Sequence, residues 1–388
     1  MNKKIVKEHM FFFILAIGTS CTFTLWRALI NNYSVEAIHF VGKDIGILQS
    51  VREVPGLLAV TALIFLLFIP EQIFLTLSMV VFGIFVMLTG FFSSKTSLIL
   101  GTLGMSFGFH YIETIKQSLS YQLLRKENLT RILGKSGGIG AMTSLITFLT
   151  ILLFWKVLDT SYQTMYLVGG GVVILIAIYM HFYFPKFHVE FEQDKKPTLK
   201  KKYWLYYVLT ILSGARRQIF VVFAPFLLVT KFNLKVDQLV TVFIINQFLL
   251  MIISPKVGKL IPKIGEKTAL IIEYLFLMII FFCYANVRTK TQGEILYILD
   301  NLFFGLSFAL SSYFKKIGNP KDMAATSSLS FTLNHTMAVI IPVTFGYIWL
   351  KNPASVFYLG VGLALTSLVF STFIPKDPKM SKETIFIR

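Results

Sequence analysis

The chain has 388 residues, of which 55% are hydrophobic and only 14% are charged, and its mean hydropathy is +0.71. Soluble domains carry about 25% charged residues, so this composition excludes an ordinary soluble protein. The alternating short segments of a membrane β-barrel are absent, and the long apolar runs favour an all-α membrane protein. The net charge of +18 comes from basic residues that are spread over short loops. That pattern indicates membrane topology rather than a surface that binds nucleic acid.

Apolar runs of about 20 residues, the length that crosses a hydrocarbon core as a helix, recur along the chain. The first run continues to Ile30 without a small-residue cleavage site, so we interpret it as a membrane span and not as a signal peptide. Cys21 and Cys283 fall inside apolar runs and are expected to be packing residues. We predict about twelve transmembrane helices, over residues 11–30, 45–68, 72–92, 97–122, 138–155, 163–184, 203–229, 238–255, 268–286, 295–314, 325–349 and 354–374.

A polar segment divides the predicted spans into two groups of six. Pro185 follows the sixth span, and a basic stretch precedes the seventh. We therefore predict an N-terminal six-helix bundle over residues 1–185, a cytoplasmic linker over 186–202, and a C-terminal six-helix bundle over 203–388 that ends in a short cytoplasmic tail.

Lysine and arginine are distributed unequally between the two sets of loops. When the N-terminus is placed inside, the cytoplasmic segments hold 24 of these residues and the segments on the opposite side hold 8. Cytoplasmic loops of membrane proteins carry such an excess. We therefore expect both termini in the cytoplasm and a multi-pass location in a bacterial cytoplasmic (inner) membrane.

Two loops resemble motifs of the major facilitator superfamily of secondary transporters. Residues 258–267 are similar to the superfamily pattern G-x-L-x-D-R-x-G-R-K, although Pro262 replaces the acid and Glu266 replaces a base. Residues 131–134, with Glu127 four positions earlier, resemble the R-x-x-G entry into the fifth span. The loop between the second and third spans does not keep the pattern. The resemblance implies two six-helix bundles around a central cavity that is lined by spans 1, 4, 7 and 10 and works by alternating access. It implies no particular substrate.

Ionisable residues inside a membrane span are costly, and they usually face a cavity or a partner. Arg216, Arg217 and Gln218 lie near the middle of the seventh predicted span. Guanidinium groups match the geometry of carboxylates and phosphates, so we interpret this triplet as a cradle for an anion. The alternative is a structural pairing with carboxylates. Because adjacent helix residues point about 100° apart, one arginine can bind substrate while the other is structural.

Other polar residues at similar depth complete the predicted site. For Glu53, Arg27 and Arg52, an ion pair of Glu53 with either arginine that holds spans together is as good an interpretation as substrate contact. Glu273 is expected to have a packing role. The further candidates for substrate contact are Arg52, His110, Tyr111, Asn246, Gln247, Asn334 and His335, and the candidates for proton coupling or gating are Arg27, Glu53, Glu113 and Asp300.

The spacing of His110 and Glu113 could suggest a metal site, but no third ligand accompanies them, and no metal site is predicted. Proton handling and a simple hydrogen-bonding role are both open for His110. Lys116 lies three residues after Glu113, a spacing that permits an ion pair on the helix surface.

These patterns predict a proton-coupled secondary transporter that moves a small polar, anionic organic solute by alternating access. Its partners are the solute, protons and the lipid bilayer, and we expect a monomer. One alternative is an exporter or flippase of an amphiphile such as a drug, siderophore or lipid-linked compound, whose cavity should be more apolar. Another is a membrane-embedded transferase, which would need a larger extramembrane loop. No enzyme activity and no cofactor are predicted, since nothing resembles a nucleotide-binding Walker loop.

The charge asymmetry predicts the side of each loop. Reporter fusions at Lys95, Lys156 and Lys290 should report the outer side, and fusions at Lys200 and Lys379 should report the cytoplasm. A cytoplasmic signal at Lys156 would contradict the twelve-span topology, because the basic residues would then no longer gather on one side.

Overall fold

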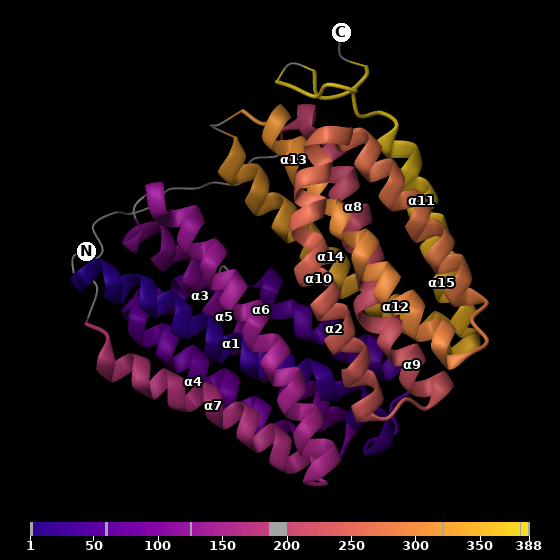
Figure 1. The fold of residues 1–388 in the computed structure, drawn as a ribbon. Coiled ribbons are helices and arrows are strands. Elements are labelled where there is room, and N and C mark those ends of the chain that lie inside the picture. Colours follow the sequence, from indigo (N-terminus) through magenta and orange to yellow (C-terminus); the bar gives the residue numbers. More distant parts are fainter. Residues whose placement is uncertain are drawn as a thin grey trace. The chain divides into compact units, whose positions relative to one another are not determined.

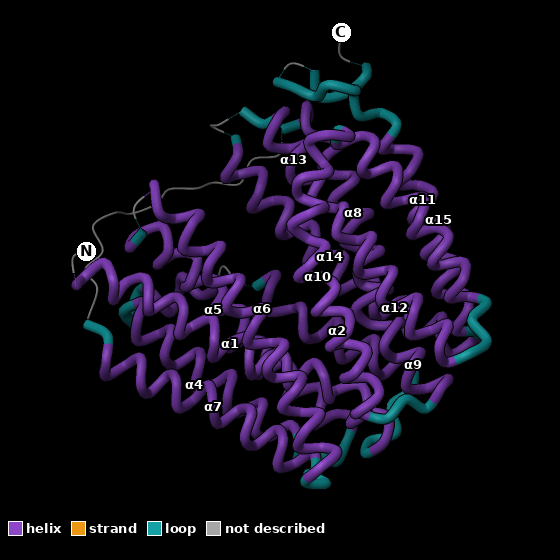
Figure 2. Tube along the Cα trace, in the orientation of Figure 1, coloured by secondary structure: helices purple, strands orange, loops and turns teal. Residues whose placement is uncertain are grey.

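In the computed structural model the chain is helical, and the structure describes residues 3–58, 61–124, 126–185, 200–319, 322–380 and 382–386. Figure 2 shows helices joined by short loops. In the described ranges the one strand-like pairing is an isolated bridge between Lys379 and Lys382. Most of the predicted linker, residues 186–199, lies outside the described residues, and the chain resumes with a 3₁₀ turn, η2, over Lys201–Tyr203.

The helices follow one another in chain order (Figure 1). Those before the linker are α1 (Lys3–Glu36), α2 (Gly42–Leu57), α3 (Ala62–Leu66), α4 (Glu71–Thr89), α5 (Lys95–Leu123), α6 (Lys126–Val157) and α7 (Tyr162–Tyr183). Those after it are α8 (Trp204–Gln218), η3 (Ile219–Phe223), α9 (Ala224–Phe232), α10 (Val236–Ile264), α11 (Glu266–Ala285), α12 (Lys290–Phe304), η4 (Gly305–Ser307), α13 (Phe308–Ile317), α14 (Met323–Lys351) and α15 (Pro353–Ser371).

Within the described residues, ten helical stretches are long and apolar enough to cross a membrane, so the chain is a multi-pass membrane protein. The most apolar window of the sixth helix, α6, is only 22% buried inside the structure. The rest of that apolar surface is suited to lipid and not to water. Two predicted spans are not among the ten. Residues 45–68 include most of α2, which has 16 residues. Residues 97–122 lie in α5, a 29-residue helix that carries several polar side chains.

The helices extend into segments that the sequence motifs suggested were loops. Helix α6 begins at Lys126, so residues 131–134 are helical, and α10 continues to Ile264 through residues 258–264. The break comes at Gly265, whose φ of 82° lies in the left-handed region that glycine adopts without strain. Helix α11 starts at the next residue.

The chain forms two compact units. Unit 1 comprises Met1–Phe40, Val51–Gln193 and Lys235–Ile244. In it, α4 packs against α5 and α7, and α1 packs against α6 and α7. The contact between α4 and α7 is close because it is made by glycines. A Cβ atom on Gly170 would lie 2.3 Å from the carbonyl oxygen of Gly83. Small residues at such a crossing let two membrane helices approach each other closely.

Unit 2 comprises Val41–Ser50, Asp194–Leu234 and Ile245–Arg388. Helix α11 packs against α12 and α15, and α8 packs against α14 and α15. The first half of α2 also belongs to this unit, where the Ser50 hydroxyl donates a hydrogen bond to the carbonyl of Val339 at 2.6 Å. Its core is rich in aromatic side chains, including the fully buried rings of Tyr203, Tyr274 and Tyr313. These helices bring the charged residues of α8, α11 and α12 into one region.

The glycine contact in unit 1 provides a test of helix packing. Gly170→Ala would force a methyl group against the backbone of α4, and we expect overpacking of this kind to destabilise the fold by roughly 1–3 kcal/mol. Gly171→Ala is the matched control on the same helix, because a Cβ atom there meets nothing within 4 Å. Thermal unfolding of the purified variants should show a lower Tm for Gly170→Ala alone. Equal Tm values for the two would show that α4 and α7 do not approach this closely.

Candidate functional site

Unit 1 contains a cavity of about 600 Å³ that is lined by α1, α5 and α6. Most of its wall consists of hydroxyl-bearing and small side chains, so it offers hydrogen bonds and space together. Two aromatic rings, three charged groups and Leu133 complete it. The side chains that can contact a solute are Thr19, Ser20, Phe23, Thr24, Arg27, Phe109, Glu113, Lys116, Ser136 and Ser144.

Helical spacing places these residues on the cavity. On α6, Ser136, Gly140 and Ser144 recur every fourth residue, which puts them on one face of the helix. On α1, Ser20 and Arg27 are seven residues apart and share a face in the same way. Helices α1 and α6 approach closely, since a Cβ atom on Gly140 would lie 2.7 Å from the Ser20 hydroxyl. The sequence interpretation named Arg27 but missed this small polar stripe, for which the four-residue spacing was the available signal.

The charges of the cavity sum to one positive charge. The Lys116 ammonium lies 2.6 Å and 2.5 Å from the two carboxylate oxygens of Glu113, one turn earlier on α5. The ion pair that the sequence spacing permits is therefore formed. Glu113 and Lys116 carry opposite charges, and the third charge of the lining is the Arg27 guanidinium, an exposed side chain on the cavity wall.

The aromatic side of the cavity is rigid. The rings of Phe23 on α1 and Phe109 on α5 stack with their centroids 4.4 Å apart and their planes 14° from parallel. The Arg52 guanidinium lies 6.0 Å from the centroid of the Phe23 ring. Polar groups on two helices of the wall are also linked by a hydrogen bond, since the Thr24 hydroxyl on α1 and the Ser144 hydroxyl on α6 are 2.8 Å apart. A solute would therefore meet walls whose side chains are already held in place.

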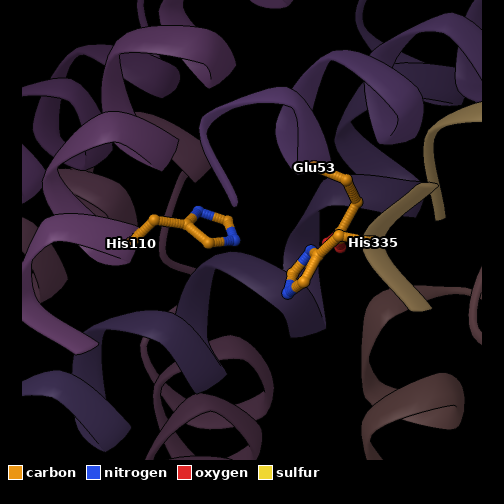
Figure 3. Close-up of side chains that lie close together, drawn as sticks. All are labelled: Glu53, His110 and His335. Carbon is orange, nitrogen blue, oxygen red and sulfur yellow. The ribbon is translucent and has the colours of Figure 1, made fainter. Parts of the chain in front are cut away.

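A second polar group of unit 1 joins α2 to α5. Figure 3 shows the side chains of Glu53, on α2, and His110, on α5. A ring nitrogen of His110 and a carboxylate oxygen of Glu53 lie within 4.8 Å of each other. Arg52 pairs with the adjacent Glu53, so this pair lies on one helix and does not itself link two spans. The link is made by Ser106, whose hydroxyl donates to the Arg52 carbonyl and lies 3.0 Å from Nδ1 of His110.

Tyr111 lies apart from this polar group. Its hydroxyl is 2.8 Å from the Thr61 hydroxyl, and its ring packs among Phe65, Phe74 and Phe107. The cavity lining does not include it. The structure therefore places Tyr111 in an aromatic cluster, where a packing role accounts for its contacts.

In unit 2 the structure separates the two adjacent arginines. Arg216 is buried, with its Nη1 atom 3.4 Å from a carboxylate oxygen of Glu273 on α11, and both side chains have no exposed surface. The guanidinium also lies 4.2 Å from the ring centroid of Tyr274. Arg217 is exposed, and Gln218 is buried. Of the two adjacent arginines, Arg216 therefore has the contacts of a buried ion pair, whereas Arg217 is exposed.

The helix changes its winding directly after this triplet. Residues Ile219–Phe223 form a π-helical turn, η3, in which the Ala224 N–H donates to the Ile219 carbonyl. Turns of this type inside α-helices are frequent at functional sites. The tenth predicted span is interrupted as well, by the 3₁₀ turn η4 at Gly305–Ser307. No signal in the sequence indicated the π-helical turn.

The remaining predicted contacts of unit 2 lie on α10 and α14. Asn246 is buried and Gln247 is partly buried on α10. Asn334 lies next to α8, because a Cβ atom on Gly214 would be 3.2 Å from its Oδ1 atom. The His335 ring packs on Phe331, with the centroids 4.2 Å apart. The contact of Asn334 places it beside the part of α8 that leads to Arg216.

The chain was compared with known proteins by sequence and by structure. No protein-family model matches it, and neither does any curated protein sequence. Solved structures match over nearly its whole length. The nucleoside transporter NupG has a TM-score of 0.73 at 14% identity over 96% of this chain and 98% of that chain. A mutant of NupG has a TM-score of 0.77 at 14% identity over 94% and 99%. A bacterial homologue of the human lysosomal transporter Spinster has a TM-score of 0.68 at 11% identity over 96% and 96%. The chain has the major facilitator fold.

The major facilitator fold allows a direct check of one expectation. The resemblance in sequence implied a cavity lined by the first, fourth, seventh and tenth spans. In unit 1 the cavity is lined by α1 and α5, which are the first and fourth predicted spans, together with α6, the fifth. The contribution of α6 follows from its stripe of serine and glycine, whose small side chains leave room for the cavity.

The different surroundings of the two arginines predict that replacing Arg216 lowers stability much more than replacing Arg217. Arg216→Ala leaves the fully buried Glu273 carboxylate without its counter-charge, and breaking such a pair costs roughly 3–5 kcal/mol. Arg217→Ala removes an exposed side chain from the next position of the same helix and should change Tm little. Thermal unfolding of both purified variants checks this. A Tm for Arg216→Ala equal to that of Arg217→Ala would contradict the buried pair.

Proposed function

We propose that this protein is a secondary active transporter that moves a small polar organic solute with an anionic group, coupled to protons, by alternating access. The observation that carries the proposal is the cavity of unit 1, whose ionisable lining sums to one positive charge among five hydroxyl groups. The fold shared with NupG and the Spinster homologue supports transport. The hydroxyls argue against the alternative of an amphiphile exporter, whose cavity should be more apolar.

In this proposal Arg27 binds the anionic group. A guanidinium fits carboxylate and phosphate oxygens with two parallel hydrogen bonds, which a lysine ammonium cannot reproduce. Such a charge-assisted bond contributes roughly 1.5–3 kcal/mol, which corresponds to about a ten- to hundred-fold change in affinity. The hydroxyls of α1 and α6 then bind the uncharged polar groups of the solute.

A neutral nucleoside is a second candidate solute. NupG, which shares the fold, is a nucleoside transporter, and a ribose carries hydroxyl groups of the kind that the lining of α1 and α6 would bind. The stacked rings of Phe23 and Phe109 offer a flat apolar wall for a base. The two candidates differ only in the anionic group, so one experiment separates them.

We further propose that α2 and α5 are membrane spans, which gives twelve in all, with both termini in the cytoplasm of a bacterial cell. These two helices carry the polar residues of unit 1, including Arg52, Glu53, Glu113 and Lys116, and such residues lower the hydropathy of a span without preventing it from crossing. The decisive reporter position is Lys95. Lys95 stands at the start of α5, so it is on the outer side if α2 crosses the membrane and in the cytoplasm if α2 does not. With Lys95 outside, an outer signal at Lys156 then requires that α5 crosses as well.

Uptake into proteoliposomes tests the solute class with matched pairs. We expect uridine 5′-monophosphate to be taken up in preference to uridine, and glucuronate in preference to glucose, because Arg27 favours the charged member of each pair. Arg27→Ala should weaken the apparent affinity about ten- to hundred-fold, and Arg27→Lys should restore it poorly. A protonophore should abolish accumulation against a gradient.

The controls separate the candidates. Arg131→Ala, which lies on α6 and is not part of the cavity lining, should leave uptake unchanged. Uptake of uridine that equals or exceeds that of its monophosphate would overturn the anionic solute and favour the nucleoside. Accumulation that persists with the protonophore would overturn proton coupling.

A further inference from the structure

Unit 2 buries three charged residues that the cavity of unit 1 does not use. Arg216 comes from α8, Glu273 from α11 and Asp300 from α12. Their exposed fractions are 1%, 0% and 1%. Arg216 contacts Glu273 directly, and Asp300 lies within electrostatic range of both. Three helices of the same unit therefore converge on one region with three ionisable groups.

The hydrogen bonds of this cluster are incomplete. Neither carboxylate oxygen of Asp300 has a hydrogen-bond partner among the described residues. The same holds for Oε2 of Glu273 and for Nε and Nη2 of Arg216. Buried polar atoms are nearly always hydrogen-bonded, and exceptions call for an explanation such as a functional role. The contact between Arg216 and Glu273 at 3.4 Å is also long for a charge-assisted bond, which is usually 2.7–2.9 Å.

The charges of the cluster do not balance. Two carboxylates and one guanidinium sum to one negative charge in a region without exposed surface. An uncompensated charge in such a place is strongly unfavourable, and buried acids avoid it by binding a proton. With one added proton the three groups are neutral. Arg216 then neutralises one carboxylate, and the other is a neutral carboxyl group.

We propose that Arg216, Glu273 and Asp300 form a proton-binding site in unit 2, in which Asp300 holds the proton while Arg216 pairs with Glu273. The proton adds to a carboxylate oxygen of Asp300 and leaves from the same atom, so no other reactant is needed. A shift of Arg216 from Glu273 toward Asp300 would favour release from Asp300. The π-helical turn η3 starts three residues after Arg216, and its Ile219 N–H donates to the Arg216 carbonyl. The arginine thus lies next to a stretch of helix with altered winding.

A metal cation fits this cluster less well than a proton does. The Arg216 guanidinium lies within range of both carboxylates and would repel a cation there. Hard cations also need about six oxygen ligands. Tyr284 on α11 lies within electrostatic range of Asp300, and also of Tyr297 on the same helix as Asp300. Helix α9 contributes Lys231, whose ammonium donates to the Val287 carbonyl at 2.6 Å.

The proposed site would bind the proton that is coupled to transport. Its role in transport rests on the proposed function, whereas the binding of the proton does not. The solute cavity lies in unit 1 and the proton site in unit 2, so solute and proton would bind to different units of the chain. The presence of the proton itself can be measured without any solute. Failure of the proton site would thus be distinguishable from failure of the transport proposal.

Infrared spectroscopy of the purified protein tests the site directly, because a protonated carboxyl group has a carbonyl stretch that a carboxylate lacks. We expect this band at neutral pH in the wild type and its loss in Asp300→Asn. Glu273→Gln should also lose it, since Arg216 is then released to pair with Asp300, which ionises. Asp300→Glu should keep a band at a shifted frequency. Glu294→Gln is the matched control on α12, where a partly exposed carboxylate faces Lys290, and it should keep the band.

Three results would overturn the proposal. The first is a wild-type protein without the band at neutral pH. The second is a band that persists in both Asp300→Asn and Glu273→Gln, which would place the proton elsewhere. The third is a band that disappears when sodium replaces choline in the buffer, which would assign the cluster to a cation. Tm values of all variants are measured alongside, and Glu273→Gln and Asp300→Glu decide the question if Asp300→Asn does not fold.

Discussion

A hydrocarbon layer cannot hydrogen-bond to a peptide group, and every other feature of this protein is arranged within that constraint. A chain that crosses such a layer must satisfy its N–H and C=O groups internally, which it does here by forming helices in nearly all of its described length. The same constraint explains the large apolar surface of α6, most of which is not buried inside the protein and is suited to lipid. Departures from regular helix are short. The π-helical turn η3 and the 3₁₀ turn η4 keep their backbone groups bonded through altered spacing.

Charged side chains obey the same constraint by pairing. Lys116 binds Glu113 on one turn of α5, and Arg216 contacts Glu273 across two helices. These pairs differ in their surroundings. The first is partly exposed in a cavity, where solvent or a solute can reach it. The second is sealed within unit 2, where neither side chain has exposed surface. Burial is therefore the main difference between the two pairs.

Both units are built from helices, but the helices of unit 1 leave room for a cavity and those of unit 2 enclose buried charges. Unit 1 uses small side chains to make space, since Ser136, Gly140 and Ser144 leave room where larger residues would fill the bundle. Unit 2 uses large buried aromatic residues around its charges, and Tyr274 lies directly against Arg216. A roomy polar cavity suits a solute that must enter and leave. A tightly packed charged cluster suits a ligand as small as a proton.

Much of this protein could be predicted from its sequence. Runs of about 20 apolar residues specify membrane helices, because helix length and lipid thickness are fixed quantities. Ten of the twelve predicted spans correspond to helices that are long and apolar enough to cross a membrane. Helices α2 and α5 do not meet this criterion of length and composition, because α2 is short and α5 carries polar residues. The helical spacing of Glu113 and Lys116 also predicted their pairing, since residues three apart share a face.

Only the tertiary structure decided what the charged residues face. Arg216 and Arg217 are adjacent and chemically identical, yet one is buried against Glu273 and the other is exposed. Helical periodicity showed that they point in different directions, but which direction leads to a partner depends on where α11 packs. From the sequence, Glu273 was expected to have only a packing role, because the position of its partner helix could not be predicted. Its partner is 57 residues away in sequence, and no local pattern connects the two. Local spacing determines which side chains share a helix face, whereas the packing of distant helices determines whether that face meets a charge, a cavity or lipid.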